Sequence, residues 1–262
     1  MTPLASSIND KKSKNRVTDP NNDYFISIEG CYTHVEVALF KNKISIDSIV
    51  KQDVKASSHL IPYLDTLLQK NSLTLDNLSF LAIDQGPGAF TSLRVSIATV
   101  NGIAYAHKIP LIGVHGLDAL CHQTAKALIN KTNTLIVCLL NAFNNDVYFS
   151  INKIQEDSIN ILEKNCKKID LVLQELQEFP DRSKFTIVFT GNGAVLHQEI
   201  ITQIFGKDSF SSPLYTNCSA QTIAEMALEQ WEENKNPENF PNSLAPHYMK
   251  TQEFSIKKNL AK

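Results

Sequence analysis

Cysteine is scarce and unpatterned in this chain of 262 residues. The five cysteines are odd in number, widely spaced and contain no Cys-x-x-Cys pair. Disulfide-rich secreted domains and structural zinc sites both use closely spaced cysteines. The sequence therefore predicts neither a disulfide framework nor a thiolate zinc site, and it indicates a protein of the reducing cytoplasm.

Long apolar runs and an excess of charge of one sign are also missing. No run approaches the roughly 20 apolar residues of a membrane span, and the N-terminus has no hydrophobic signal core. The net charge is −2, from 25 basic and 27 acidic residues. Nucleic-acid-binding domains usually carry a strongly basic stripe, so we expect any RNA to be held mainly by another protein.

Motifs for catalysis are lacking as well. The chain contains no Gly-Lys-Ser/Thr nucleotide loop, and no Gly-x-Ser-x-Gly elbow surrounds a serine such as Ser96. His115 and His122 are close enough in sequence to share a helical face, but we interpret them as capping or surface residues. We therefore predict no catalytic residue, no cofactor-binding residue and no metal ligand on this chain.

The most informative stretch that is present runs from residue 78 to residue 103. Its apolar start, Phe80–Ile83, is typical of a strand buried on both faces. A tight turn comes next at Gly86, Pro87 and Gly88, and apolar residues then recur at three- and four-residue steps, as on one face of a helix. The stretch predicts a strand, a glycine turn and a helix.

Two interpretations of this turn remain open. Small residues let backbone N–H groups approach a phosphate at a helix N-terminus, but Pro87 removes one donor and Thr91 stands where a dinucleotide fingerprint needs glycine. The alternative is a close strand-to-helix connection in which Asp84 accepts a hydrogen bond from the backbone two residues on. Thr91 or Ser92 can cap the helix. Thr91 and Arg94 are candidates for fixing the turn or meeting a partner.

Strand and helix patterns recur along the chain in two similar halves. The first half has predicted strands at 24–28, 35–40, 43–50, 80–83 and 111–114, and helices at 57–68, from 90 to beyond 103, and at 117–129. The second half has strands at 134–140, 146–154, 159–165 and 185–189, and helices at 171–178, from 193 to about 204, and at 220–233. Two copies of β-β-β-α-β-α predict an internal duplication.

The glycine turn also carries a family resemblance. Gly86-Pro87-Gly88-Ala89-Phe90-Thr91-Ser92-Leu93-Arg94 closely resembles the GPGSFTGLR signature of the bacterial TsaB (YeaZ) proteins. Segments 98–104, 109–114 and 117–120 resemble the residues that come after this signature in those proteins. The resemblance implies an α/β protein with the duplicated actin-like (ASKHA, ribonuclease H-like) fold and two subdomains.

This fold divides the chain into four parts. They are a disordered N-terminal extension (1–22), an N-terminal ASKHA-like subdomain (23–130), a C-terminal ASKHA-like subdomain (131–240) and a C-terminal tail (241–262). The extension is polar, with too few large apolar groups to offset the entropy of the chain.

The resemblance implies a function in tRNA modification. Proteins of that family are non-catalytic partners of a TsaD-like catalytic subunit. With a TsaE-like ATPase, they support formation of threonylcarbamoyladenosine next to the anticodon. The resemblance thus implies ATP and metal on the partner subunits, tRNA contact only through the complex, and a homodimer when the chain is alone. Alternatives are a small ATPase or carbohydrate kinase of the same fold, or a peptidase-like protein.

Two hairpin positions bear on the ATPase alternative. Kinases and ATPases of this fold grip phosphate and metal with an acidic hairpin from each half, and the matching positions here are Glu29 and Asn141. Asparagine brings no negative charge for magnesium, and Phe143 stands where glycine would allow close backbone approach. The sequence therefore predicts an incomplete phosphate clamp, and no ATP hydrolysis by the chain alone.

The resemblance further implies that partners bind the first half of the chain. We expect this interface on the two helices that flank the glycine turn region. Its predicted residues are His59, Leu60, Leu64, Leu67, Leu93, Ile97, Val100, Asn101 and Ala104.

Overall fold

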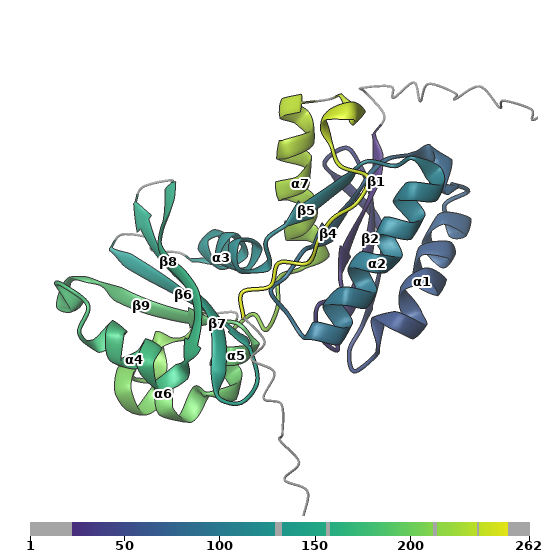
Figure 1. Cartoon of the computed structure of the whole chain (residues 1–262). Coiled ribbons are helices and arrows are strands. Elements are labelled where there is room, and N and C mark those ends of the chain that lie inside the picture. Colours follow the sequence, from purple (N-terminus) through teal and green to yellow (C-terminus); the bar gives the residue numbers. More distant parts are fainter. Residues whose placement is uncertain (1–22, 129–132, 156–157, 212–213, 235, 251–262) are drawn as a thin grey trace, which may run out of the picture.

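The computed structural model describes residues 23–128, 133–155, 158–211, 214–234 and 236–250 (Figure 1). The predicted N-terminal extension, 1–22, lies outside these ranges, as do residues 251–262 of the predicted C-terminal tail. No helix in the described ranges is both long and apolar enough to cross a lipid bilayer.

The first half of the chain forms a five-stranded sheet in the order β3-β2-β1-β4-β5. The first three strands pair antiparallel, whereas β4 pairs parallel with β1 and with β5. All seven residues of β4 are buried, as its unbroken apolar run predicts. The strands are β1 (Tyr24–Glu29), β2 (Val35–Lys41), β3 (Ile44–Lys51), β4 (Leu78–Asp84) and β5 (Leu111–Val114).

Helices cover both faces of this sheet (Figure 1). On one face, α1 (Ala56–Lys70) and α2 (Phe90–His107) pack beside each other, with their apolar stripes in one core with the strands. On the other face lies α7 (Ala220–Asn234), which comes from the end of the chain. The described part of the chain has short 3₁₀ turns at Leu75–Asn77, Arg182–Lys184, Lys207–Ser209 and Pro237–Asn239.

The second half repeats the arrangement with four strands, in the order β8-β7-β6-β9. These are β6 (Thr134–Asn141), β7 (Asp146–Gln155), β8 (Ser158–Lys168) and β9 (Thr186–Thr190). One face is covered by α4 (Ile169–Gln177), α5 (Asn192–Leu196) and α6 (Gln198–Phe205), and the other by α3 (Gly116–Ala127). The single helix predicted up to about residue 204 is wrong, because the chain breaks at His197 into α5 and α6.

The two halves exchange helices. α3 comes after the first sheet but packs on the second, and α7 comes after the second sheet but packs on the first. Their apolar faces share a core that runs between the sheets and contains Phe80, Leu120, Ile136 and Trp231. Strands β1–β5 thus come before α3 and strands β6–β9 after it, whereas α3 and α7 each pack on the sheet of the other half.

Candidate functional site

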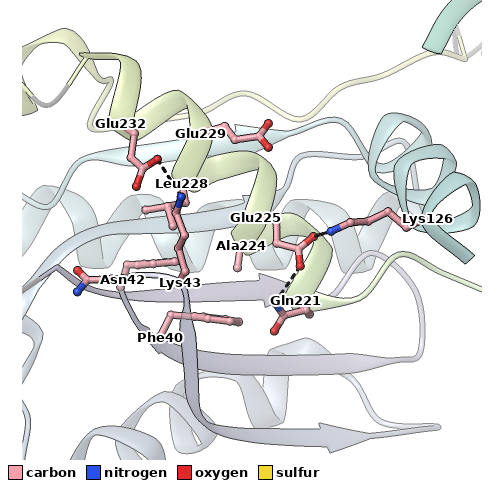
Figure 2. Close-up of a pocket in the computed structure, with 11 residues that line it drawn as sticks. Phe40, Asn42, Lys43, Lys126, Gln221, Ala224, Glu225, Leu228, Glu229 and Glu232 are labelled. Atoms are coloured by element: carbon pink, nitrogen blue, oxygen red, sulfur yellow. Dashed lines mark hydrogen bonds and ion pairs between the residues drawn. The ribbon is translucent and has the colours of Figure 1, made fainter. Parts of the chain in front are cut away.

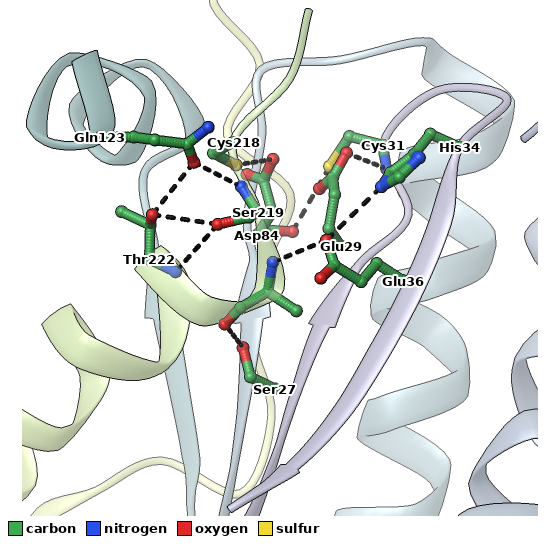
Figure 3. Close-up of polar contacts among 11 residues, drawn as sticks. Ser27, Glu29, Cys31, His34, Glu36, Asp84, Gln123, Cys218, Ser219 and Thr222 are labelled. Carbon is green, nitrogen blue, oxygen red and sulfur yellow. Dashed lines mark hydrogen bonds and ion pairs between the residues drawn. The ribbon is translucent and has the colours of Figure 1, made fainter. Parts of the chain in front are cut away.

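The candidate site lies where the first sheet meets the start of α7 (Figure 3). Glu29 ends β1 and Asp84 ends β4, so the two carboxylates emerge side by side from neighbouring parallel strands. Cys218 lies two residues before α7 and comes from the other half of the chain. In open α/β sheets, ligands usually bind outside the carboxyl ends of the strands.

These three side chains form a compact buried group. One donor atom from each of Glu29, Asp84 and Cys218 lies within 4.8 Å of the others. The Gly86 N–H donates to Asp84 Oδ1 at 2.8 Å, which confirms the predicted hydrogen bond two residues on. The Cys218 thiol donates to Asp84 Oδ2 at 3.5 Å, and the Cys31 N–H donates to Glu29 Oε1 at 3.3 Å. Asp84 is thereby held from two sides.

Burial dominates the electrostatics of the group. It raises the pKa of Glu29 well above the ordinary value, and the nearby Asp84 charge adds to the effect. Burial also raises the pKa of Asp84, against hydrogen bonds that lower it. The thiol pKa values of Cys31 and Cys218 are raised well above normal, first by burial and then by Asp84. Such protonated, buried thiols are poor nucleophiles, so neither cysteine is suited to attack a peptide bond.

Polar contacts anchor the first turn of α7 beside this group (Figure 3). The Ala220 N–H donates to Glu36 Oε2 at 2.9 Å, and Ser27 Oγ donates to the Ala220 carbonyl at 2.7 Å. The Ser219 N–H donates to Gln123 Oε1 of α3 at 2.8 Å. The helix start is therefore tied to β1, β2 and α3 at once.

The glycine turn packs closely on the chain itself. A Cβ atom on Gly88 would lie 2.7 Å from Cys31 Cβ and 2.9 Å from the Cys31 carbonyl oxygen, which requires glycine. Gly86 has φ +100°, a conformation that glycine adopts without strain. The Gln85, Gly86 and Ala89 N–H groups all donate within the chain, to Val114 O, Asp84 Oδ1 and Cys31 O. This arrangement favours the close-connection interpretation over a phosphate cradle.

The helix after the turn begins at Phe90, with Ala89 as an N-cap that makes no side-chain hydrogen bond. The predicted cap at Thr91 or Ser92 is therefore wrong, because both residues already lie in the first helical turn. Thr91 is exposed, so its hydroxyl is not part of the buried site.

The C-terminal segment, residues 241–250, covers the turn and α2. Arg94 Nε donates to the Tyr248 hydroxyl at 2.6 Å, and its guanidinium lies 3.5 Å from the centre of the Phe90 ring. Asn101 exchanges two hydrogen bonds of 2.9 Å with the Leu244 backbone. The Gln85 carbonyl accepts from the His247 N–H at 2.8 Å. Arg94 thus fixes this segment to the start of α2.

The second hairpin, between β6 and β7, is closed by its own hydrogen bonds. Asn141 Oδ1 accepts from the Phe143 N–H at 2.8 Å, and the Ala142 and Asp146 N–H groups bond within the turn at 3.0 Å. Phe143, Asn144 and Asn145 all have φ near +60°, and the Phe143 ring is 52% exposed. These residues do not fit the phosphates of a nucleotide, because the Ala142, Phe143 and Asp146 N–H groups donate within the turn. The Asp146 carboxylate is already paired with Lys168 and Lys250.

Of the two histidines interpreted as capping or surface residues, His115 takes a capping position. His115 is the N-cap of α3 and stacks edge-on against His247, with ring centres 5.3 Å apart. Burial lowers the pKa of His115 to about 4, so the ring is neutral at pH 7. The carboxylate and thiol group near Asp84 contains neither His115 nor His122.

The predicted partner interface needs correction at its apolar positions. Seven of its side chains are at most 3% exposed and form the core between the first sheet and its helices. They are Leu60, Leu64, Leu67, Leu93, Ile97, Val100 and Ala104. His59 and Asn101 are half-buried. Helical periodicity identified the apolar face of each helix correctly, but that face is turned towards the sheet.

A separate pocket of about 240 Å³ lies between α7 and the β2–β3 turn (Figure 2). Phe25 and Phe40 contribute to its lining, and the ion pairs Lys126–Glu225 (2.6 Å) and Lys43–Glu232 (3.6 Å) cross its rim. The pocket shares no residue with the glycine turn or with the carboxylate and thiol group, so we treat it as separate from the candidate site.

Comparison with known proteins identifies the family. A family model described as TsaD, tRNA N6-adenosine threonylcarbamoyltransferase, matches residues 53–258. The chain is 26% identical over 127 residues to the tRNA threonylcarbamoyladenosine biosynthesis protein TsaB of Buchnera aphidicola, covering 48% of this chain and 59% of that protein. The chain belongs to the TsaB (YeaZ) family. A TsaB of Haemophilus influenzae is 33% identical over 94 residues, covering 36% of this chain and 39% of that protein.

A solved structure of the TsaB (YeaZ) family confirms the fold. YeaZ from Pseudomonas aeruginosa superposes with a TM-score of 0.66 at 17% sequence identity, covering 86% of this chain and 99% of that one. The duplicated actin-like α/β fold predicted from the sequence is therefore correct. The sequence alignments with two Buchnera aphidicola TsaB proteins span 59% and 61% of those relatives' length.

Sequence patterns do not bring the three residues of the buried group together. Glu29 and Asp84 stand out singly, and Cys218 carries no signal, because 134 residues separate it from Asp84. One local signal is available. Glu29 and Asp84 each end a buried strand, and parallel strands place such residues at one edge of a sheet.

Proposed function

We propose that the chain is a non-catalytic partner subunit in the synthesis of N6-threonylcarbamoyladenosine, the modified adenosine next to the anticodon of tRNA. In this proposal a TsaD-like subunit carries the active site and a TsaE-like protein hydrolyses ATP. The tRNA is contacted through the assembled complex. The names of the matched family model and of the curated relatives support this place in tRNA modification.

The observation that carries the non-catalytic role is the state of the two hairpins. The second hairpin uses the Asn141 side chain to close its own turn. At the first, Glu29 is 1% exposed and packed against Asp84 and a thiol. The second hairpin is therefore closed against phosphate, and the buried Glu29 is not open to the metal of a bound nucleotide, which supports a partner role over an ATPase or kinase.

The surface proposed for the partner is the outer face of α1 and α2. Ile61 is 56% exposed and Tyr105 is 80% exposed, although both are large apolar side chains on helices. Ala98 and Gly102 are also exposed on α2 and are small enough for a second helix to approach closely. The leucines on the opposite side of these helices pack in the core with the first sheet. The same face would serve a homodimer when the partner is absent.

The test is a pull-down with the TsaD-like protein of the same organism, combined with sedimentation of the chain alone. We expect wild-type association, and an affinity at least about tenfold weaker for Ile61→Glu and Ala98→Glu, because a charge is then desolvated in the contact. Leu171→Glu on α4 is the matched control, since Leu171 is 50% exposed on the other half. Circular dichroism verifies that each variant is folded.

Two outcomes would overturn the proposal. If the wild type does not associate with the TsaD-like protein, the chain is not its partner. If both folded variants associate as the wild type does, the outer face of α1 and α2 is not the interface. Micromolar binding of ATP and magnesium by the isolated chain would instead support the ATPase or kinase alternative.

A further inference from the structure

We propose that Glu29, Asp84 and Cys218 bind a divalent metal ion of the zinc class, at the junction of the first sheet and α7. This site lies outside the proposed partner surface and does not depend on the proposed function. It departs from the sequence expectation that the chain carries no metal ligand.

The first argument is the geometry of the three donor atoms. Zinc binds thiolate sulfur at about 2.3 Å and carboxylate oxygen at about 2.0–2.2 Å, so donors around a tetrahedral ion lie roughly 3.5 Å apart. The donors of Glu29, Asp84 and Cys218 already lie within 4.8 Å of one another. Metal binding would therefore require the donors to move closer by roughly one ångström.

The second argument is an unused acceptor in the group. Glu29 Oε2 is buried and accepts no hydrogen bond from the described part of the chain, while Oε1 accepts one from the Cys31 N–H. Without an ion, the two buried carboxyl groups are held together by a shared proton. A cation between Glu29 and Asp84 would replace this proton and offset the repulsion between the two carboxylates.

The chemistry of the donors selects the class of ion. Magnesium and calcium prefer shells made of oxygen alone, whereas zinc accepts thiolate sulfur together with carboxylate oxygen. Three protein ligands leave a fourth position for water. Gly116 leaves room for the Asp84 carboxylate, because a Cβ atom there would lie 2.7 Å from Asp84 Oδ1.

The position of Cys218 indicates what the ion would do. Glu29 and Asp84 belong to the first sheet, whereas Cys218 belongs to the segment that leads from the second half into α7. An ion bound by all three would clamp the start of α7 to the ends of β1 and β4. Because only the folded chain assembles these ligands, binding would raise the melting temperature.

The test uses the full chain without a histidine tag, stripped with a chelator and titrated with cobalt(II) as a spectroscopic substitute for zinc. We expect one cobalt ion per chain and a thiolate-to-cobalt absorption band in the near ultraviolet. Zinc should displace the cobalt and raise the melting temperature. Cys218→Ser should abolish the band, and Glu29→Gln should weaken binding about tenfold or more.

The matched control is Cys166→Ser, which removes a half-buried thiol outside the group. This variant should keep the band and the stoichiometry of the wild type. The proposal is overturned if the wild type shows no thiolate band, or if the band persists in Cys218→Ser. It is also overturned if zinc raises the melting temperature of folded Glu29→Gln as much as that of the wild type, since Glu29 is then not a ligand.

Discussion

Trp231 offers the sharpest test of the helix exchange between the two halves. It is 1% exposed on α7, and its ring centre lies 5.0 Å from that of Phe80 in the first sheet and 5.2 Å from that of Phe240. Its indole N–H donates to Asp23 Oδ2 at 3.1 Å. If α7 is an integral layer of the first half, truncating this side chain must destabilise the whole fold.

The expected magnitude can be worked out from the contacts. Truncation of a buried tryptophan to alanine costs about 3–5 kcal/mol of unfolding free energy through lost apolar contact and the cavity left behind. Asp23 is 4% exposed, and it keeps a second bond, from Ser79 Oγ at 2.6 Å. Loss of the indole N–H therefore adds about 1–3 kcal/mol at most. Trp231→Phe retains most of the packing, so we expect it to cost about 1–3 kcal/mol.

The assay is urea unfolding followed by far-ultraviolet circular dichroism. Trp231 is the chain's only tryptophan, so its fluorescence reports on α7 in the wild type but cannot be used for Trp231→Ala or Trp231→Phe. The control is Gln230→Ala, an exposed neighbour whose loss should change stability by less than about 0.5 kcal/mol. A cost below about 1 kcal/mol for Trp231→Ala would refute the view that α7 completes the core of the first half.

Two further predictions concern a titrating residue and the corrected interface. His115 has a pKa of about 4 in the fold and about 6.5 in an unfolded chain. Its contribution to the free energy of unfolding is therefore fully present above pH 6.5 and is lost as the pH falls towards 4. His115→Gln should make the decline in unfolding free energy between pH 7 and pH 5 smaller by about 1–2 kcal/mol. The measurement is urea unfolding at both pH values, and a decline equal to that of the wild type would contradict the prediction. Ile97→Glu should lose its folded circular dichroism signal, because Ile97 is 2% exposed in the core and an unpaired buried charge costs several kcal/mol; a folded, monomeric variant would show that Ile97 belongs to an interface after all.

The chain's element order could be read from local patterns alone. Apolar residues at every second position located the strands, and apolar residues at three- and four-residue steps located the helices, to within a few residues. The strand Leu111–Val114 was predicted with its observed bounds. These patterns are local because strand pleating and helical pitch act over neighbouring residues. The hydrogen bond from Gly86 to Asp84 was predictable for the same reason, since it spans two residues.

The residue at which α2 begins after the glycine turn was less predictable than the presence of the helix. The cap of α2 was misplaced because Ala89 takes the N-cap position without any side-chain bond, while the carbonyl of Cys31 holds its N–H from another part of the chain. A capping preference of Thr91 or Ser92 is worth about 1 kcal/mol. The tight packing of Gly88 on the first hairpin overrides it.

The sequence by itself determined the elements, the duplication and the glycine turn, because each depends on spacing along the chain. Which surface covers each apolar face was decided only by tertiary structure. Periodicity shows that Leu64 and Val100 share an apolar face, but not that a sheet buries it. The return of α7 to the first sheet likewise brings Cys218 to Asp84 across 134 residues. No local preference records such a contact, since it arises only when both halves pack around the shared core.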